Sequence, residues 1–147
     1  MEDLGKIVKE ILDQGYLMSL GTYDESGPWV SEVLFVNDGV SLYWLSSVNT
    51  RHSKAVVLSH KAAATITLAN KLGDKEVGLQ IEGKAEKIEG DVFKIAKKHR
   101  IKRGKPVPEK EGDILGPNES WYKLTPTKIE IINAPLWGFA KKSLEIK

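Results

Sequence analysis

The chain has 147 residues, about the length of one ordinary domain, and we expect residues 1–147 to form a single domain. Hydrophobic residues make up 41% and charged residues 29%, proportions that exclude collagen-like, mucin-like and wholly disordered chains. No apolar run approaches the ~18 residues that a membrane helix needs, and the acidic N-terminus is unlike a signal peptide. A cytoplasmic location is therefore expected.

The absence of cysteine narrows the chemistry further. Without thiols the protein has no disulfides, no cysteine-ligated zinc, no iron–sulfur cluster and no thiol nucleophile. The three histidines, His52, His60 and His99, are too scattered for an HExxH-type motif, so no metal site is expected. The net charge of +2 is uneven, because residues 84–110 contain ten lysine and arginine residues against four acidic ones.

The first third of the sequence predicts a helix followed by a three-stranded antiparallel meander. Apolar residues at helical spacing predict a helix over residues 4–14, with Asp3 as its cap and Gly15 at its end. Segments rich in β-branched and aromatic residues, separated by turn residues, predict three strands. These strands are expected at Tyr16–Tyr23, Trp29–Val36 and Val40–Leu45.

The rest of the sequence predicts two further helices and up to four strands. The helices are expected over Ser53–Ser59 and from an Asp91 cap to about Lys102, and a loop is expected over 104–119. The strands are expected at Ala62–Ala69, Val77–Ile88, Ser120–Leu124 and Lys128–Ile132, the last two separated at Pro126. Because the strands are joined mainly by turns, we expect a mainly β fold, an antiparallel barrel of six or seven strands with peripheral helices.

The segment 45–54 carries the sharpest local pattern, a strand end that leads through hydroxyl-bearing residues into a helix start. A helix N-terminus offers unpaired N–H groups, and the guanidinium of Arg51 offers a fork of donors that suits a phosphate. Ser46, Ser47 and Thr50 add hydroxyl donors, and Lys54 adds charge one turn later. The alternative is that Thr50 only caps a helix and Arg51 is a solvated surface residue.

The order of these elements resembles the FMN-binding split barrel of the pyridoxamine 5′-phosphate oxidase-like superfamily, with the closest likeness to its YhbP-type group. The segments that carry the likeness are Thr50-Arg51-His52, Ile81 to Gly90, the basic run Lys94–Arg103 and the tail Gly138 to Lys142. This resemblance covers nearly the whole chain. It implies a Greek-key split β-barrel with an N-terminal and a crossover helix, and a homodimer with two FMN sites between the subunits.

The resemblance also implies which residues contact the cofactor. Ser46, Thr50 and Arg51 match the family's phosphate contacts, and His52 stands where many relatives have lysine. Main-chain groups of the strand with Glu32, Val33 and Leu34 are expected beside the flavin ring. Trp137 and Phe139 are candidates to cover the ring from the partner subunit. The full set of expected cofactor-binding residues is Glu32, Val33, Leu34, Ser46, Ser47, Thr50, Arg51, His52, Lys54, Trp137, Lys141 and Lys142.

The function implied is that of an FMN-binding flavoprotein acting as an oxidoreductase on a small molecule. Two departures argue against pyridoxamine phosphate oxidase activity itself: Gly78 replaces a glutamine near the cofactor, and the tail lacks the Arg-x-His substrate segment. No catalytic residue is identified, because Ser46 and Ser47 lack a recognisable His or Asp partner.

Three alternatives stay open at this level. The barrel is compatible with a binding module that holds FMN without turnover, or with another planar ligand such as a deazaflavin or haem, for which His52 or His60 are the candidate axial ligands. The cations of residues 97–105 suggest nucleic-acid binding, but no aromatic residues are interleaved with them, and a solvated helix end explains them as well. Nucleic acid is therefore not expected as a partner, and neither is a membrane.

Overall fold

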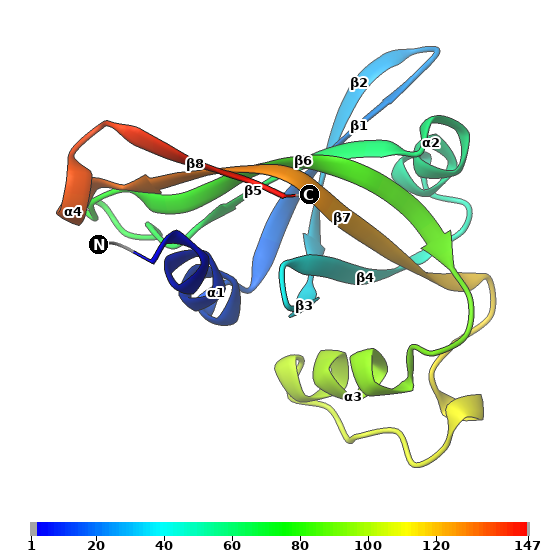
Figure 1. Cartoon of the computed structure of the whole chain (residues 1–147). Helices are drawn as coiled ribbons and strands as arrows, with labels where there is room; N and C mark the ends of the chain where they lie inside the picture. The colour runs from blue at the N-terminus through cyan, green and yellow to red at the C-terminus, as the bar shows by residue number, and fades with distance from the viewer. Residues whose placement is uncertain (1–2, 147) are drawn as a thin grey trace.

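The structure is a computed structural model, and it describes residues 3–146. Eight antiparallel strands form one sheet in the order β2-β1-β5-β6-β7-β4-β3, with β8 paired to β7. The sheet is curled into a half-barrel, with helices at its periphery (Figure 1). The expected mainly β split barrel is confirmed, although it has eight strands rather than six or seven.

The N-terminal helix and the meander follow the sequence pattern closely. Helix α1 (Leu4–Gln14) is capped by the side chain of Asp3, which accepts a hydrogen bond from the N–H of Lys6 at 3.1 Å. The next four elements are β1 (Leu17–Asp24), β2 (Gly27–Leu34), β3 (Val36–Asp38) and β4 (Ser41–Ser47). The single strand expected at Trp29–Val36 thus ends at Leu34, and the prediction that it continues to Val36 is wrong. The chain changes partner at Phe35, because Leu34 pairs with Leu17 of β1 whereas Val36 pairs with Tyr43 of β4.

The central elements are α2 (Arg51–Ser59), β5 (Lys61–Thr67), β6 (Val77–Ile88) and α3 (Phe93–Lys102). Helix α2 begins two residues earlier than expected because Thr50 caps it, and His60 ends it in the left-handed region at φ 57°. The Asp91 cap expected for α3 is wrong. The residue before this helix is Val92, and no side chain caps its N-terminus.

A single 15-residue strand, β7 (Glu119–Asn133), replaces the two strands that Pro126 was expected to separate. The sheet accommodates the proline at a β-bulge, where Glu82 pairs with Lys128 but Gly83 pairs with Pro126, leaving Thr127 unpaired in the ladder. A Cβ atom on Gly83 would lie 2.1 Å from the carbonyl oxygen of Thr125. The bulge therefore requires glycine opposite the proline.

The remaining segments complete the sheet and cover its ends. A short 3-10 helix, η1 (Glu111–Asp113), lies in the loop before β7. Helix α4 (Ala134–Trp137) follows β7, and β8 (Lys141–Glu145) returns along it. Strand β7 thus pairs with β6 on one side, and with β4 and then β8 on the other.

Two hydrophobic clusters stabilise the fold. The larger cluster fills the inside of the half-barrel and is closed by Val8, Ile11 and Leu12 of α1. The smaller one lies under α3, where Trp121 of β7 packs against Ile95 and other apolar residues of that helix. Within residues 3–146, no helix has the length and apolar character needed to cross a bilayer.

Lysine side chains tie α3 to β3 and to the residue before it. The Nζ of Lys98 donates to the carbonyl oxygen of Asn37, and the Nζ of Lys102 donates to that of Phe35, both at 2.5 Å. The ammonium of Lys102 also lies 3.9 Å from the centre of the Phe35 ring. Burial lowers the pKa of Lys102 to about 8.

Candidate functional site

The candidate site is the junction between β4 and α2, where the chain leaves the sheet. Thr50 accepts a hydrogen bond from the N–H of Ser53 at 3.1 Å, and its own hydroxyl lies 3.2 Å from the carbonyl oxygen of Ser47 and 2.7 Å from Ser53 Oγ. In the described part of the chain, the N–H groups of Arg51 and His52 have no protein acceptor. The junction therefore keeps the donors that a helix N-terminus offers to an anion.

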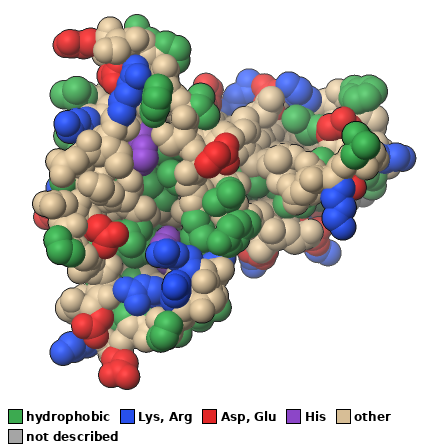
Figure 2. Space-filling model, turned by 180° about the vertical axis from the view of Figure 1, so that it is seen from behind, with side chains coloured by type: hydrophobic (Ala, Val, Ile, Leu, Met, Phe, Trp, Pro, Cys, Tyr) green, Lys and Arg blue, Asp and Glu red, His purple; other side chains and the backbone are tan. Residues whose placement is uncertain are grey.

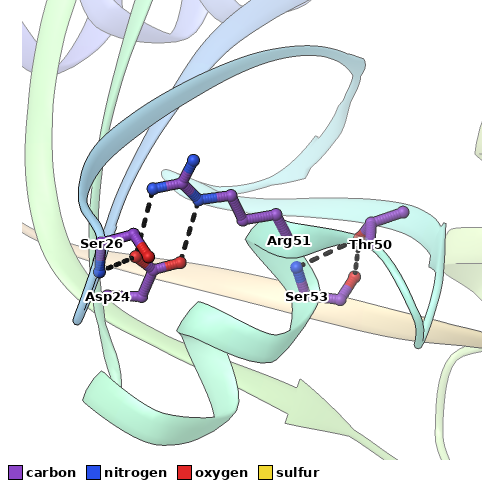
Figure 3. A network of polar contacts seen from close by, with 5 residues as sticks. All are labelled: Asp24, Ser26, Thr50, Arg51 and Ser53. Atoms are coloured by element: carbon purple, nitrogen blue, oxygen red, sulfur yellow. Dashed lines mark hydrogen bonds and ion pairs between the residues drawn. The ribbon is translucent and has the colours of Figure 1, made fainter.

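Arg51 is held by the tip of the β1–β2 hairpin (Figure 3). Its Nε and Nη2 donate to the two carboxylate oxygens of Asp24 at 3.0 and 3.2 Å. Asp24 is in turn positioned by the backbone N–H of Ser26, which donates to it at 2.8 Å. Hydrogen bonding from Arg51 lowers the pKa of Asp24 below its ordinary value, so the pair is ionised at neutral pH.

The rest of the guanidinium remains available at this site. The Arg51 side chain is one-third exposed and lies 4.5 Å from the centre of the Trp29 ring. In Figure 3 its third nitrogen, Nη1, points away from Asp24. Asp24 occupies one edge of the guanidinium, and the edge that contains Nη1 is free to donate to a ligand oxygen.

A second contact at the junction joins Ser46 to His52. The Oγ of Ser46 lies 2.9 Å from Nε2 of His52, and His52 is only 8% exposed. Burial lowers the pKa of His52 below its ordinary value. The expectation that Ser46 has no histidine partner is therefore wrong. Residues six positions apart are about 20 Å apart in a continuous strand and lie on different faces of a helix, so the contact depends on the turn between β4 and α2.

Ser47 and Lys54 lie at the same junction but make different contacts. The Oγ of Ser47 accepts a hydrogen bond from the N–H of Asn49 at 3.2 Å, which stabilises the turn. Lys54 is exposed, and with Lys87 it borders a small apolar hollow beside α2 that contains Val57 and Leu58. The junction thus brings together six of the expected residues: Ser46, Ser47, Thr50, Arg51, His52 and Lys54.

The expected flavin-facing residues Glu32, Val33 and Leu34 lie on β2, which contacts both α2 and β4. Glu32 accepts a hydrogen bond from the hydroxyl of Ser19 across the β1–β2 ladder. Val33 is half-buried against the core. This segment is separate from the junction, because Asp24 and Trp29, which contact Arg51, lie toward the other end of the hairpin.

Trp137, Lys141 and Lys142 lie at the opposite end of the sheet from α2 (Figure 1). Ser47 pairs with Glu119 at the start of β7, whereas α4 follows Asn133 at its end, about 45 Å away along the strand. At that end Lys141 donates to Gln80 at 2.9 Å, and Lys142 lies 4.8 Å from the centre of the Trp137 ring. One chain therefore does not bring these three residues to the junction.

The structure gives a physical reason for the glycine at position 78, where a glutamine was expected from the resemblance to the oxidase enzymes. This glycine pairs with Thr67 of β5, and a Cβ atom on it would lie 2.3 Å from the carbonyl oxygen of Ile66. A side chain at this position, such as the glutamine of the oxidase enzymes, would require β5 and β6 to move apart.

A groove that sequence reasoning missed lies at the other end of α2. It encloses about 760 Å³ between β1, β5 and β6, and its lining includes Tyr23, Pro28, His60, Lys61 and Lys84. Small residues form part of its lining, and their outward positions carry no distinctive sequence pattern. This groove is larger than the hollow beside α2 that Lys54 borders, which has a volume of about 340 Å³.

The basic run of α3 does not form an uninterrupted cationic surface. Lys98 and Lys102 donate to the carbonyl oxygens of Asn37 and Phe35, and Arg100 donates to the carbonyl oxygen of Asp113 at 2.9 Å. In the lower part of Figure 2, which contains α3, lysine and arginine side chains lie among acidic ones. This arrangement does not favour nucleic acid as the ligand.

Comparison with known families gives one match. The sequence profile described as "Pyridoxamine 5′-phosphate oxidase" matches residues 4–133, which include every strand except β8. Comparison with curated protein sequences gives no significant match.

Solved structures with the same fold differ in what their names describe. A putative pyridoxamine 5′-phosphate oxidase from Listeria innocua is 21% identical, with a TM-score of 0.71 over 89% of this chain and 99% of that one. A haem-binding protein from Mycobacterium smegmatis is 17% identical, with a TM-score of 0.72 over 99% of this chain and 59% of that one. An F420 reductase is 18% identical, with a TM-score of 0.63 over 82% of this chain and 94% of that one. At these identities the likeness establishes the fold alone.

Proposed function

Because the chain belongs to the pyridoxamine 5′-phosphate oxidase family, we propose that it is an FMN-binding flavoprotein whose phosphate site is the β4–α2 junction. The observation that carries the proposal is the set of donors gathered there. The N–H groups of Arg51 and His52 lack protein acceptors, and the guanidinium of Arg51 keeps one edge free. These donors fit the terminal phosphate of FMN.

Each group has a distinct part in this arrangement. Arg51 supplies charge-assisted hydrogen bonds to the phosphate, and Ser46 supplies a neutral one. Thr50 keeps the helix N-terminus in place, and main-chain groups of Glu32, Val33 and Leu34 are placed beside the ring. When bound, FMN supplies the redox chemistry, and the protein orients it and controls access. We infer that the protein is an oxidoreductase for a small molecule.

The position of the C-terminal residues supports a homodimer as the functional form. Trp137, Lys141 and Lys142 lie at the far end of the sheet from the junction in their own chain. These residues reach a cofactor at the junction only if a second copy supplies them. We therefore propose a dimer with two FMN sites between its subunits, in which Trp137 covers the ring and the lysines add charge. Light scattering with and without FMN measures this assembly.

The proposal is tested by FMN binding to the purified protein, followed by absorbance and calorimetry. Arg51→Ala removes charge-assisted phosphate contacts, so we expect a loss of about 1.5–3 kcal/mol, or roughly tenfold to a hundredfold in Kd. Arg103→Ala, an exposed arginine after α3, is the matched control and leaves FMN affinity unchanged. Equal affinity of Arg51→Ala and wild-type protein would contradict the assignment.

A second candidate ligand is haem or a deazaflavin, held with or without turnover. His60 supports haem, because this exposed histidine lines the 760 Å³ groove, whereas Nε2 of His52 is engaged by Ser46. Titration with haemin distinguishes the candidates. A Soret band that is lost in His60→Asn would favour haem, whereas uptake of FMN without such a band supports the flavoprotein.

A further inference from the structure

The contact between Ser46 and His52 places a titratable ring directly behind a hydroxyl group at the junction. Ser46 is half-buried at the end of β4, whereas the His52 ring is almost completely enclosed. Ser46 is the more exposed of the two residues, so its hydroxyl is the group of the pair that a ligand at the junction would contact. A hydrogen bond of 2.9 Å joins the two residues. The protonation state of the ring therefore determines whether Ser46 presents a proton or oxygen lone pairs to the ligand.

The direction of this hydrogen bond depends on the proton count of His52. A neutral ring can accept the serine proton at Nε2, and Ser46 then presents only oxygen lone pairs to solvent. An imidazolium must donate from Nε2 to Ser46, which frees the serine proton to point outward. A phosphate dianion accepts hydrogen bonds and repels lone pairs, so it binds better to the second arrangement.

We propose that the Ser46–His52 pair is a proton-linked phosphate contact, in which binding of FMN dianion is accompanied by uptake of one proton from solvent by His52. In this scheme His52 is a positioning residue that acts through Ser46. A lysine at this position would carry its charge throughout the neutral pH range, whereas His52 carries a charge only when it is protonated. The inference rests on the proposed function of the junction, and it adds a pH dependence that a lysine at position 52 would not give.

The burial of His52 supports this linkage. Burial keeps the pKa of the free ring below its ordinary value, so the ring is neutral at pH 7 before ligand binds. Two negative charges on a neighbouring phosphate act in the opposite direction and favour the imidazolium. The pKa of His52 therefore rises on binding, and the affinity for FMN rises as pH falls through the interval between the two values.

The charged groups around α2 other than histidine do not ordinarily titrate near neutral pH, so a histidine is the expected source of the proton linkage. Helix α2 packs against β1, β2 and β6. On these elements Asp24 pairs with Arg51, and Lys84 pairs with Glu86. The other charged groups are Lys54 on α2, Glu32 on β2, and Glu82 and Lys87 on β6. Carboxylates, lysines and arginines ordinarily titrate outside about pH 6.5–8. His60 at the end of α2 is the other histidine to be tested.

Calorimetry of FMN binding at pH 7, in two buffers with different ionisation enthalpies, counts the protons taken up by the wild-type protein. We expect uptake approaching one proton, and an FMN affinity that rises about threefold to tenfold per unit decrease in pH between about 8 and 6.5. The phosphate of FMN stays largely dianionic in that range. Riboflavin lacks the phosphate and shows no proton uptake.

Variants separate the linkage from a merely structural role of His52. His52→Lys gives pH-independent FMN binding, His52→Gln binds more weakly and also without linkage, and His60→Asn keeps the wild-type profile. NMR of the His52 ring in the wild-type protein, free and FMN-loaded, reports the same proton without any substitution. FMN binding without proton uptake, or equal linkage with riboflavin, would overturn this proposal alone. Absence of FMN binding at every pH would overturn the proposed function and this inference with it.

Discussion

Asp24 and Arg51 form a two-point ion pair, with distances of 3.0 and 3.2 Å, that joins the tip of the β1–β2 hairpin to the first turn of α2. The pair holds the guanidinium in one place over Trp29. It also cancels the charge of the arginine at the position where an anionic ligand is proposed to bind. These two effects act in opposite directions on ligand affinity.

We predict that Asp24→Asn tightens FMN binding by several-fold at low salt. The substitution removes a negative charge next to the phosphate, whereas the amide still accepts one hydrogen bond from Arg51. Calorimetry at two salt concentrations measures the effect, which becomes smaller as salt screens the charges. Glu25→Gln, an exposed acid at the same turn, is the control and changes affinity less. Weaker binding by Asp24→Asn would mean that orientation of Arg51 outweighs its charge.

We predict that Gly83→Ala destabilises the protein by about 2–3 kcal/mol or more. The added Cβ would lie 2.1 Å from the Thr125 carbonyl oxygen and 2.8 Å from the Cα of Pro126, and both are backbone atoms that cannot move independently of the bulge. Urea unfolding measures the change. Gly112→Ala is the matched control, since its Cβ meets no atom within 4 Å, and its stability stays within about 0.5 kcal/mol of wild type. A similar loss in both variants would contradict the role of the bulge.

Local patterns in the sequence predicted most of the helices and strands, because these depend on neighbouring residues. The spacing of Val8, Ile11 and Leu12 places them on one face of α1, and the cap at Asp3 is confirmed. The break at Pro126 was wrong because the tolerance of a strand for proline depends on Gly83, a residue far away in the sequence. Strand β8 was missed because its pairing with β7 supplies the stabilisation that its polar sequence does not show.

The site was predictable only where its residues are close together in the sequence. Segment 45–54 predicted hydroxyl and basic residues gathered where a strand leads into a helix, and the structure brings these residues together, whereas phosphate binding there stays a prediction. The contact between Asp24 and Arg51 spans 27 positions and depends on how the hairpin leans on α2, so the turn pattern gave no sign of it. The distance of Trp137 from the junction likewise follows from the length of β7, which the sequence pattern divided in two.

We predict that His99 makes the protein sensitive to acid. Burial and the positive charges of Arg103, Arg100 and Lys102 lower the pKa of His99 to about 4 in the folded protein, whereas an unfolded histidine titrates near 6.5. Below about pH 6.5 the unfolded chain binds the proton more readily, so stability falls as pH falls, by up to about 3 kcal/mol near pH 4. The ring lies 5.1 Å from that of Trp121 in an edge-to-face contact.

His99→Phe keeps an aromatic ring against Trp121 and removes the titrating group. We expect its stability to fall less steeply than that of the wild-type protein between pH 6.5 and about 4, in urea unfolding at a series of pH values. His60→Asn, at the exposed end of α2, retains the wild-type slope. Parallel slopes for His99→Phe and wild type would show that carboxylates, rather than this histidine, control acid unfolding.

We predict a pH dependence of the same sign from Lys102, but at alkaline pH. Burial lowers the pKa of this lysine to about 8, from the ordinary value of 10.5, while the charge of Asp13 opposes and that of Lys98 adds to the shift. Between these two pH values the unfolded chain holds the proton more tightly, so the contribution of Lys102 to stability rises as pH rises from about 8 to about 10.5. Lys102→Met removes this rise.

The measurement is urea unfolding from pH 7.5 to 10.5. At each pH, the free energy of unfolding of the wild-type protein is subtracted from that of the variant. Lys98→Met is the matched control, because it removes the neighbouring lysine–carbonyl bond to Asn37 without removing the buried ammonium at Phe35. We expect the difference between Lys102→Met and wild type to change steadily across this range, and that for Lys98→Met to stay level. If both differences stay level, the ammonium of Lys102 is hydrated in solution, and α3 is joined to the sheet by the packing of Trp121 and Ile95 rather than by that lysine.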